Sequence, residues 1–354
     1  MMSESIKRHK RAKMTELHLD NQGLTELDLS PYPNLELLYC GNNKLTKLDL
    51  RYTPNLHKLW CPNNNISHLD FSFTPNLFMV GCDNNKLREI DTSNLEYLEY
   101  LFCKNNEIIS LDLSNNPYLL NIACDNNRLK KINVENNALL INLSCGKNLL
   151  PEIYLFNTPR LEGLLCSENS LQELDLFNKP RLKTLLFHDN KIKHIDLSNK
   201  TKIKQLSCSY NMLEILDLSD LSMLQHLTCN NNKISNLNLS GNGQLLSVYC
   251  QENRITQLDV SNLYVLEEFA CSHNHLTQLD VSSNPSLTSL YCHNNQLMTL
   301  NVTGTDELAE LSCANNKIRQ LDLSSSKKLR DIDVSGNPLN DLDIGNTEIS
   351  KHLH

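Results

Sequence analysis

The sequence predicts a repeat solenoid with one parallel β-sheet along one face. Three regularities indicate this fold: cysteine recurs every 21 residues, asparagine follows three residues behind each of these positions, and leucines recur at fixed offsets between them. Such a period is typical of arrays in which each repeat buries its apolar side against its neighbours. A chain of 354 residues can therefore form one continuous array instead of several globular domains.

The 13 cysteines of the chain all lie in one column of the repeat. They are Cys40, Cys61, Cys82, Cys103, Cys124, Cys145, Cys166, Cys208, Cys229, Cys250, Cys271, Cys292 and Cys313. Phe187 takes the one position in this row that lacks a cysteine. The asparagine column runs without interruption from Asn43 to Asn337. Chance does not produce two such columns in register.

The start of each repeat has the pattern of a short strand. In the second repeat, Leu38 and Cys40 alternate with Tyr39. Because successive side chains of a strand point to opposite faces, Leu38 and Cys40 are expected to point inward and Tyr39 outward. Stacked repeats would then pair these strands into a parallel sheet.

The rest of each repeat predicts a sharp turn and an extended return on the back. We expect the Asn43 column to turn the chain off the sheet, with its amide bonding backbone groups of its own and the next repeat. The leucines at 45, 48 and 50 would fill the interior, and the alternation of Leu48, Asp49 and Leu50 favours extended or short 3-10 segments over a helix. About sixteen such turns would form a gently curved, twisted solenoid.

These residues resemble the leucine-rich repeat, with cysteine in the second leucine position of the strand. The 21-residue form with a cysteine column is similar to the cysteine-ladder repeats of bacterial internalins, the internalin J branch. The resemblance covers Met14 to about Ile349. It implies a single leucine-rich repeat solenoid over residues 14–354, with 1–13 as a basic tail or cap. Because members of the family bind many unrelated partners, it implies binding without naming a partner.

Composition narrows the classes of partner and the location. A formal net charge of -8 gives no positive field for phosphates, so nucleic acid is not an expected partner of the solenoid. No stretch approaches the roughly 18 apolar residues of a membrane span. The N-terminal segment is basic but lacks the apolar centre of a secretory signal. We therefore expect a cytoplasmic protein, or an effector secreted by a route that needs no signal peptide.

The cysteine column predicts packing, not chemistry. Cysteine in an inward position behaves as a small apolar residue, and an odd number of thiols cannot all pair. Metal sites need ligands that converge from different loops, which one sulfur per buried turn does not provide. We expect a reduced, packed ladder without metal or cofactor.

A second column is acidic and is expected to be a solvated, turn-forming stripe on the back. It contains Asp28, Asp49, Asp70, Asp91, Asp112, Asp175, Asp196, Asp217, Asp259, Asp280, Asp322 and Asp343. A serine often follows two residues later and can hydrogen-bond the carboxylate. Calcium along this stripe is the weaker alternative, because a calcium site needs oxygens from several directions.

Three histidines, His273, His275 and His293, come close together if adjacent repeats are in register. A zinc site is the minority interpretation, since the neighbouring Cys271 and Cys292 are expected to face inward. When the residues are assigned to positions of the repeat, no nucleophile comes to lie beside a base, and no phosphate-binding loop is found. We therefore predict no catalytic residues and no enzyme activity.

The outward strand positions of the first repeats predict a partner-binding surface, because the repeat itself does not require apolar groups there. We call this surface the front patch, and it consists of Leu37, Tyr39, Trp60, Phe78, Met79, Tyr100 and Phe102. A contiguous exposed aromatic surface usually marks an interaction site. The alternative is that one or two of these side chains tuck into the edge of the core.

A second irregularity occurs in the middle of the chain. Tyr154 stands in the acidic column and Phe156 and Phe177 replace the serine that usually follows. We call these three residues the back patch. Local repacking around the larger Phe187 and a second contact surface are both open interpretations.

Together these features predict a non-enzymatic module that binds a protein partner on the sheet face. One alternative is a glycan-binding surface or adhesin-type protein, since aromatic platforms also suit sugars. The other is the substrate-targeting part of an enzyme whose catalytic domain lies outside this sequence.

Overall fold

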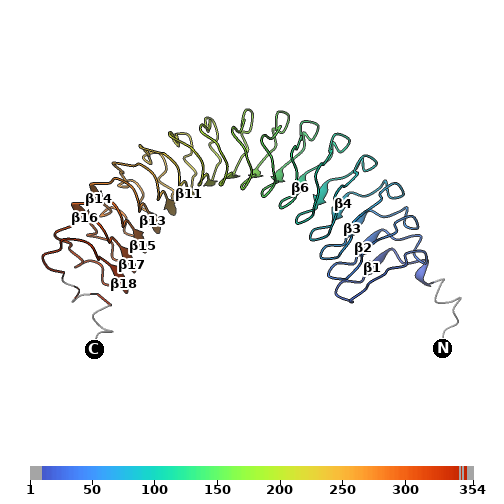
Figure 1. The fold of residues 1–354 in the computed structure, drawn as a ribbon, viewed down its shortest axis with the longest axis horizontal. Helices are drawn as coiled ribbons and strands as arrows, with labels where there is room; N and C mark the ends of the chain where they lie inside the picture. Colours follow the sequence, from blue (N-terminus) through green and yellow to red (C-terminus); the bar gives the residue numbers. More distant parts are fainter. Residues whose placement is uncertain (1–9, 343, 345–346, 349–354) are drawn as a thin grey trace. The chain divides into compact units, whose positions relative to one another are not determined.

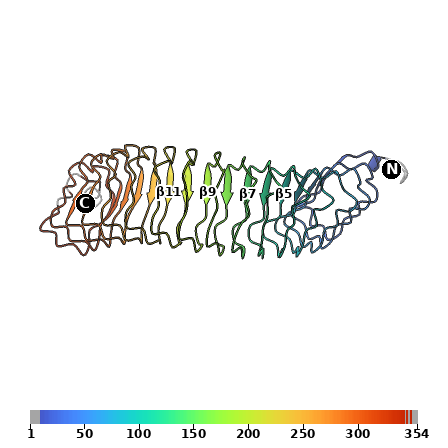
Figure 2. The same ribbon diagram turned by 90° about the horizontal axis from the view of Figure 1, so that it is seen from above.

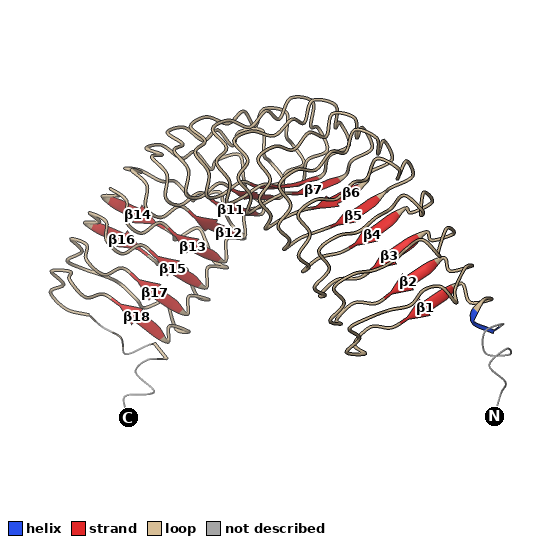
Figure 3. Ribbon diagram, turned by 45° about the vertical axis from the view of Figure 1, so that its right-hand side comes forward, coloured by secondary structure: helices blue, strands red, loops and turns tan. Residues whose placement is uncertain are grey.

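A computed structural model of the chain describes residues 10–342, 344 and 347–348. It divides into two compact units, residues 1–181 and 182–354, which we call units 1 and 2 and describe separately. Most of the predicted basic segment 1–13, and Asp343 of the acidic column, lie outside the described residues. Lys10 and Arg11 form a short helical turn (Figure 3). The expectation of a single solenoid over 14–354 stays a prediction.

Unit 1 is built around a parallel sheet of three-residue strands (Figure 1). The strands are β1 (Glu16–His18), β2 (Leu37–Tyr39), β3 (Lys58–Trp60), β4 (Met79–Gly81), β5 (Tyr100–Phe102), β6 (Asn121–Ala123), β7 (Asn142–Ser144) and β8 (Gly163–Leu165). Each strand pairs with the next at a register of one repeat, so that Tyr39 lies opposite Trp60, and Trp60 opposite Gly81. The predicted parallel solenoid with 21-residue turns and almost no helix is confirmed.

Unit 2 repeats this arrangement and adds a short second sheet. Its main strands are β9 (Thr184–Leu186), β10 (Gln205–Ser207), β11 (His226–Thr228), β12 (Ser247–Tyr249), β13 (Glu268–Ala270), β15 (Ser289–Tyr291), β17 (Glu310–Ser312) and β18 (Asp331–Asp333). Strands β14 (Gln278–Asp280) and β16 (Thr299–Asn301) pair in parallel on the back. Figure 2 shows the strands of each unit as arrows that lie side by side.

The interior of each turn is filled from both sides, as the pattern predicts. The middle residue of a strand and the following cysteine are buried, and Leu38 and Cys40 have no exposed surface. Leu45 and Leu50 approach the same interior from the return segment and are also buried. Burial of these columns removes most of the apolar surface of the repeat from water, which is the main stabilising term of the fold.

The turn after each strand differs from the expectation by one residue. The left-handed backbone conformation belongs to the residue before the asparagine column, with φ of 54° at Asn42 and 55° at Asn63. In several repeats this residue is not asparagine, as at Lys147 and Tyr210. Asparagine tolerates this conformation better than most residues, because its short amide can bond locally. The asparagine of the column, such as Asn43, therefore comes directly after the turn and does not form it.

The asparagine of the column instead holds neighbouring repeats together. The Asn64 amide nitrogen donates to the carbonyl of Cys61 in its own repeat (3.2 Å) and to that of Cys40 in the preceding one (3.0 Å). Its side-chain oxygen accepts the N–H of Leu45 (2.9 Å). The bonds between repeats therefore run to the preceding repeat, whereas we had expected the next one. These bonds give hydrogen-bond partners to buried backbone groups, which would destabilise the folded protein if they had none.

The acidic column lies at the surface on the back, as predicted. Asp70 accepts the backbone N–H of Ser72 (2.9 Å), and the same bond recurs between Asp217 and Ser219 (3.0 Å). Hydrogen bonds from the serine two residues later hold the pKa of these carboxyls below the usual value. Besides β14 and β16, the described return segments pair only at an isolated parallel bridge between Asn133 and Tyr154.

Within the described part of the chain, no helix has the length and hydropathy that crossing a membrane would require.

Candidate partner-binding surface

The front patch lies on one side of unit 1, on strands β2 to β5 and the residue that precedes β4. The middle residues of these strands are buried, whereas Leu37, Tyr39, Trp60 and Phe102 on either side of them are half-buried. Phe78, Met79 and Tyr100 are half-buried as well. The alternation places the six strand residues on the sheet surface, whereas Phe78 precedes the strand and is not positioned by it.

Trp60 is the centre of this packing. Gly81 lies opposite it on β4, and a Cβ atom added at Gly81 would lie 2.1 Å from Cε3 of the indole. The indole therefore covers the backbone of Gly81, in space that any other residue would occupy. It also meets the ring of Phe102 edge to face, with centroids 5.9 Å apart. Glycine at this one position lets a tryptophan lie across the neighbouring strand.

Tyr39 and Lys58 extend the surface toward β1. The ring of Tyr39 stacks on His18, with centroids 4.6 Å apart and an interplanar angle of 5°. The Lys58 ammonium lies 4.9 Å from the centroid of Tyr39 and 5.9 Å from that of Trp60. A cation over the face of an aromatic ring is attracted by the quadrupole of the ring. Lys58 thus lies within reach of both rings.

The remaining residues complete the patch on the other side of Trp60. Tyr100 and Phe102 lie on β5, and their rings are nearly parallel with centroids 6.5 Å apart. Met79 lies between Lys58 and Tyr100 in the register of the sheet. The register therefore places six of the seven predicted residues on the adjacent strands β2 to β5, with Leu37 opposite Glu16, and Phe78 directly precedes β4.

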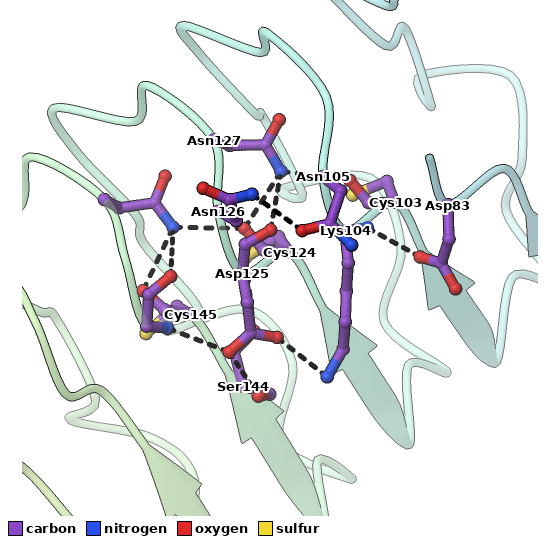
Figure 4. A network of polar contacts seen from close by, with 12 residues as sticks. Asp83, Cys103, Lys104, Asn105, Cys124, Asp125, Asn126, Asn127, Ser144 and Cys145 are labelled. Carbon is purple, nitrogen blue, oxygen red and sulfur yellow. Dashed lines mark hydrogen bonds and ion pairs between the residues drawn. The ribbon is translucent and has the colours of Figure 1, made fainter. Parts of the chain in front are cut away.

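A polar network borders the patch at the ends of the strands (Figure 4). Asp83 accepts the backbone N–H of Lys104 (2.6 Å), and the Lys104 ammonium pairs with Asp125 (3.0 Å). Asp125 also accepts the hydroxyl of Ser144 (2.6 Å). Burial raises the pKa of Asp83, because the surroundings disfavour its charged form. This edge of the patch is therefore acidic and partly desolvated.

The three residues of the back patch differ in their surroundings. Phe156 and Phe177 are each 70% exposed, so water covers most of both rings. Tyr154 is half-buried, its hydroxyl donates to Glu152 (2.5 Å), and Lys131 lies 5.3 Å from its ring centroid. Phe156 and Phe177 are more exposed than Tyr154, and no aromatic ring pair involves either of them among the described residues.

The histidines of unit 2 are only partly brought together. The rings of His273 and His293 meet edge to face at 5.4 Å, and the side chains of Asn294, Ser272 and Ser312 are within hydrogen-bonding distance of them. His275 is exposed. Across the described residues, no group of three or more histidine, cysteine, aspartate or glutamate side chains is placed to hold a metal ion.

A shallow groove on the back of unit 2 is lined by amides, hydroxyls and carboxylates, including Gln257, Asp259 and Gln278. Hydrogen bonds from Ser261 lower the pKa of Asp259, so this carboxyl is ionised and is a poor proton donor near neutral pH. The residues that line the groove include no histidine, cysteine or lysine.

Three residues of the surface were not foreseen: Lys58, Gly81 and Asp83. One signal for Gly81 was available, since it is the only glycine at the third strand position in the whole chain and lies opposite the only tryptophan. The positions of the Lys58 ammonium and the Asp83 carboxylate depend on side-chain conformations, which the repeat pattern does not encode.

The comparisons with known proteins support the fold. No family model matches the sequence, and no curated protein matches it either. Among solved structures, the functional domain of InlJ from Listeria monocytogenes, which includes a cysteine ladder, is 29% identical with a TM-score of 0.74. The match covers 96% of this chain and 67% of that one. The predicted likeness to internalin-type cysteine-ladder repeats is confirmed.

Two further structures have a similar fold. The Leptospira interrogans leucine-rich repeat protein LIC12759 is 22% identical with a TM-score of 0.84, covering 99% of this chain and 96% of its own. YopM from Yersinia pestis, described as a leucine-rich effector protein, is 26% identical with a TM-score of 0.69, covering 96% and 88%.

Proposed function

We propose that this leucine-rich repeat solenoid is a non-enzymatic module that binds a protein partner through the front patch. The observation that carries the proposal is the fixed position of Trp60, which lies across Gly81 and against Phe102 on the outward face of the sheet. Large aromatic residues contribute a disproportionate share of the energy of protein interfaces. Rings that are already ordered lose little conformational freedom when a partner binds.

We infer a cytoplasmic location, or secretion as an effector by a route that needs no signal peptide. The likeness to YopM, which is named an effector protein, supports the second location. A glycan is the second candidate ligand, because the flat stack of His18 on Tyr39 would also suit the face of a sugar.

The experiment compares three baits in a cross-linked pull-down: the wild-type protein, Tyr39→Ala with Trp60→Ala, and Tyr249→Ala with Tyr291→Ala. The last variant is the matched control, since both tyrosines are half-buried at the third strand position but belong to unit 2. We expect a protein that the wild type and the control retain and the front-patch variant loses. A protein retained equally by all three baits would contradict the proposal and direct attention to the back patch.

The same three baits on a glycan array test the second candidate. Glycan binding that disappears with Trp60, in the absence of a protein partner, would replace the protein-binding role by a sugar-binding one.

A further inference from the structure

The front patch is surrounded by acidic side chains. Strands β1 to β5 and the two residues on either side of each contain five carboxylates and two lysines, Lys58 and Lys104. The carboxylates are those of Glu16, Asp20, Glu36, Asp83 and Glu99. The Lys104 ammonium is already paired with Asp125, so it compensates little of this charge. The region therefore carries an excess of negative charge around an aromatic centre.

Lys58 shows what kind of group the aromatic centre accepts. Its ammonium lies over Tyr39 and within reach of Trp60, in the space between the two rings. An intramolecular cation at this position demonstrates that the two ring faces and their surroundings can hold an alkylammonium group. A guanidinium group would fit the same faces, because it stacks on aromatic rings and is weakly hydrated.

We propose that the partner presents a cationic segment to the front patch, with an arginine or lysine side chain that takes the place of Lys58 between Tyr39 and Trp60. This inference rests on the proposed function. It adds the chemical class of the partner: a basic protein segment with apolar side chains beside its charges.

Charge complementarity favours this partner over an acidic one. Glu36 and Glu99 directly precede β2 and β5, so carboxylates lie on that edge of the patch, and Asp83 lies on the other edge. An acidic segment would place its charges against these groups, which costs affinity, whereas a basic segment gains from each of them.

The test uses the intrinsic fluorescence of Trp60, which reports on this site alone because it is the only tryptophan of the chain. One probe is a synthetic peptide of alternating arginine and leucine, and the other is a peptide of equal length with glutamate in place of arginine. We expect a saturable change of Trp60 emission with the basic peptide only. The affinity should weaken with added salt, since the flanking carboxylates are exposed to screening.

Two variants test whether the front patch favours a positively charged ligand. Lys58→Met removes the resident cation and keeps an unbranched side chain, so the basic peptide should bind about 2- to 5-fold more tightly. Glu36→Gln with Glu99→Gln should weaken it at least about threefold. The control, Glu267→Gln with Asp331→Asn, neutralises two exposed carboxylates of unit 2 and should leave the affinity unchanged. Glu267 lies in the column of Glu36 and Glu99, and Asp331 lies in the column that follows it. Melting curves confirm that each variant is folded.

Tighter binding of the acidic peptide, or weaker binding of the basic peptide to Lys58→Met, would overturn the inference. Its failure can be told apart from failure of the proposed function by using the partner recovered in the pull-down. One outcome is that the partner loses its binding to Tyr39→Ala with Trp60→Ala while it binds Lys58→Met and the carboxylate variant as it binds the wild type. In that case the front patch is the binding site and the preference for a cationic segment is wrong. If the aromatic variant keeps the partner, the proposed function itself fails.

Discussion

At the scale of single residues, the contact between Trp60 and Gly81 explains why an indole lies flat on a sheet that is otherwise lined with shorter side chains. Third strand positions of adjacent strands are direct neighbours across a parallel pair, so a side chain at position 81 would fill the space that the indole uses. The absence of a Cβ at one residue thus sets the shape of the front patch.

Replacing Gly81 with alanine should displace Trp60 from the sheet. The new Cβ would lie 2.1 Å from Cε3 of the indole, which is far closer than atoms approach, so the ring must rotate away into water. We expect the emission of Trp60 to shift to longer wavelength. Gly163→Ala is the control, because its Cβ would meet only the flexible amide of Asn142. Unchanged emission in Gly81→Ala would show that the indole does not lie across this glycine.

The cysteines should be unreactive in the folded protein. All 13 are free and buried, and burial raises the pKa of the Cys40 thiol to about 12, which removes the reactive thiolate near neutral pH. A thiol reagent should therefore label few or none of them in the native protein and all of them in urea. Rapid labelling of most cysteines in the native protein would contradict the buried ladder.

At the scale of the repeating element, the tandem asparagines divide two tasks between them. The first accepts the left-handed conformation of the turn, and the second ties its repeat to the preceding one. Asn85 donates to the carbonyls of Cys61 (3.1 Å) and Cys82 (3.0 Å), and it accepts the N–H of Ile66 (2.9 Å). Removing this amide would leave backbone groups unsatisfied inside the solenoid.

Asn85→Ala should lower the free energy of unfolding by roughly 1 to 3 kcal/mol, the cost of a buried polar group without a partner. Urea unfolding followed by circular dichroism measures this change. The neighbouring Asn84→Gly is the control, since glycine adopts the φ of 55° at that position without strain and the bond that is lost, to Asn105, is exposed. Equal losses in both variants would contradict the division of tasks.

The turns of the acidic column predict how stability depends on pH. Hydrogen bonds lower the folded pKa of these carboxyls, to about 2 for Asp49, where Arg51 bonds the carboxylate. A lowered folded pKa gives stability that is complete above the unfolded value of about 3.9 and is lost as the pH falls through the folded value. The raised pKa of Asp83 makes its contribution to stability increase as the pH falls. The several carboxyls of the acidic column outweigh this one residue.

The melting temperature should therefore be nearly constant from neutral pH to about pH 5 and should fall between about pH 4 and 2. Asp217→Asn keeps an acceptor for the N–H of Ser219 but cannot titrate, so it should make this fall slightly less steep. Melting curves across the pH range measure both effects. A melting temperature that rises between pH 4 and pH 2 would contradict the role given to these turns.

At the scale of the whole molecule, the period of 21 residues predicted the fold because each column repeats many times. Local irregularities average out, and the inward columns of Leu38 and Cys40 and the outward column of Tyr39 were predicted correctly. Six residues of the front patch lie on adjacent strands because of the register, and Phe78 directly precedes one of these strands. Their role as a binding surface stays a proposal.

Features that depend on side-chain conformation were not predictable from the pattern. Two adjacent asparagines cannot reveal which of them takes the left-handed conformation, and the pattern assigned the turn to Asn43 instead of Asn42. The pattern also does not reveal that the Tyr154 hydroxyl bonds Glu152 or that Lys131 lies near its ring. Likewise, nothing in the repeat places Lys58 between two aromatic rings. The role of the back patch stays a proposal.

The most direct test of the account is titration calorimetry of the recovered partner against the wild type, Tyr39→Ala with Trp60→Ala, and the control Tyr249→Ala with Tyr291→Ala. Because both front-patch side chains lie on the surface of the sheet, their removal opens no core cavity, and the melting temperature should change little. We predict that binding weakens by at least about 2 kcal/mol in the front-patch variant and stays intact in the control. Full affinity of the front-patch variant would contradict the account, and a collapsed melting curve would show that Trp60 is a core residue.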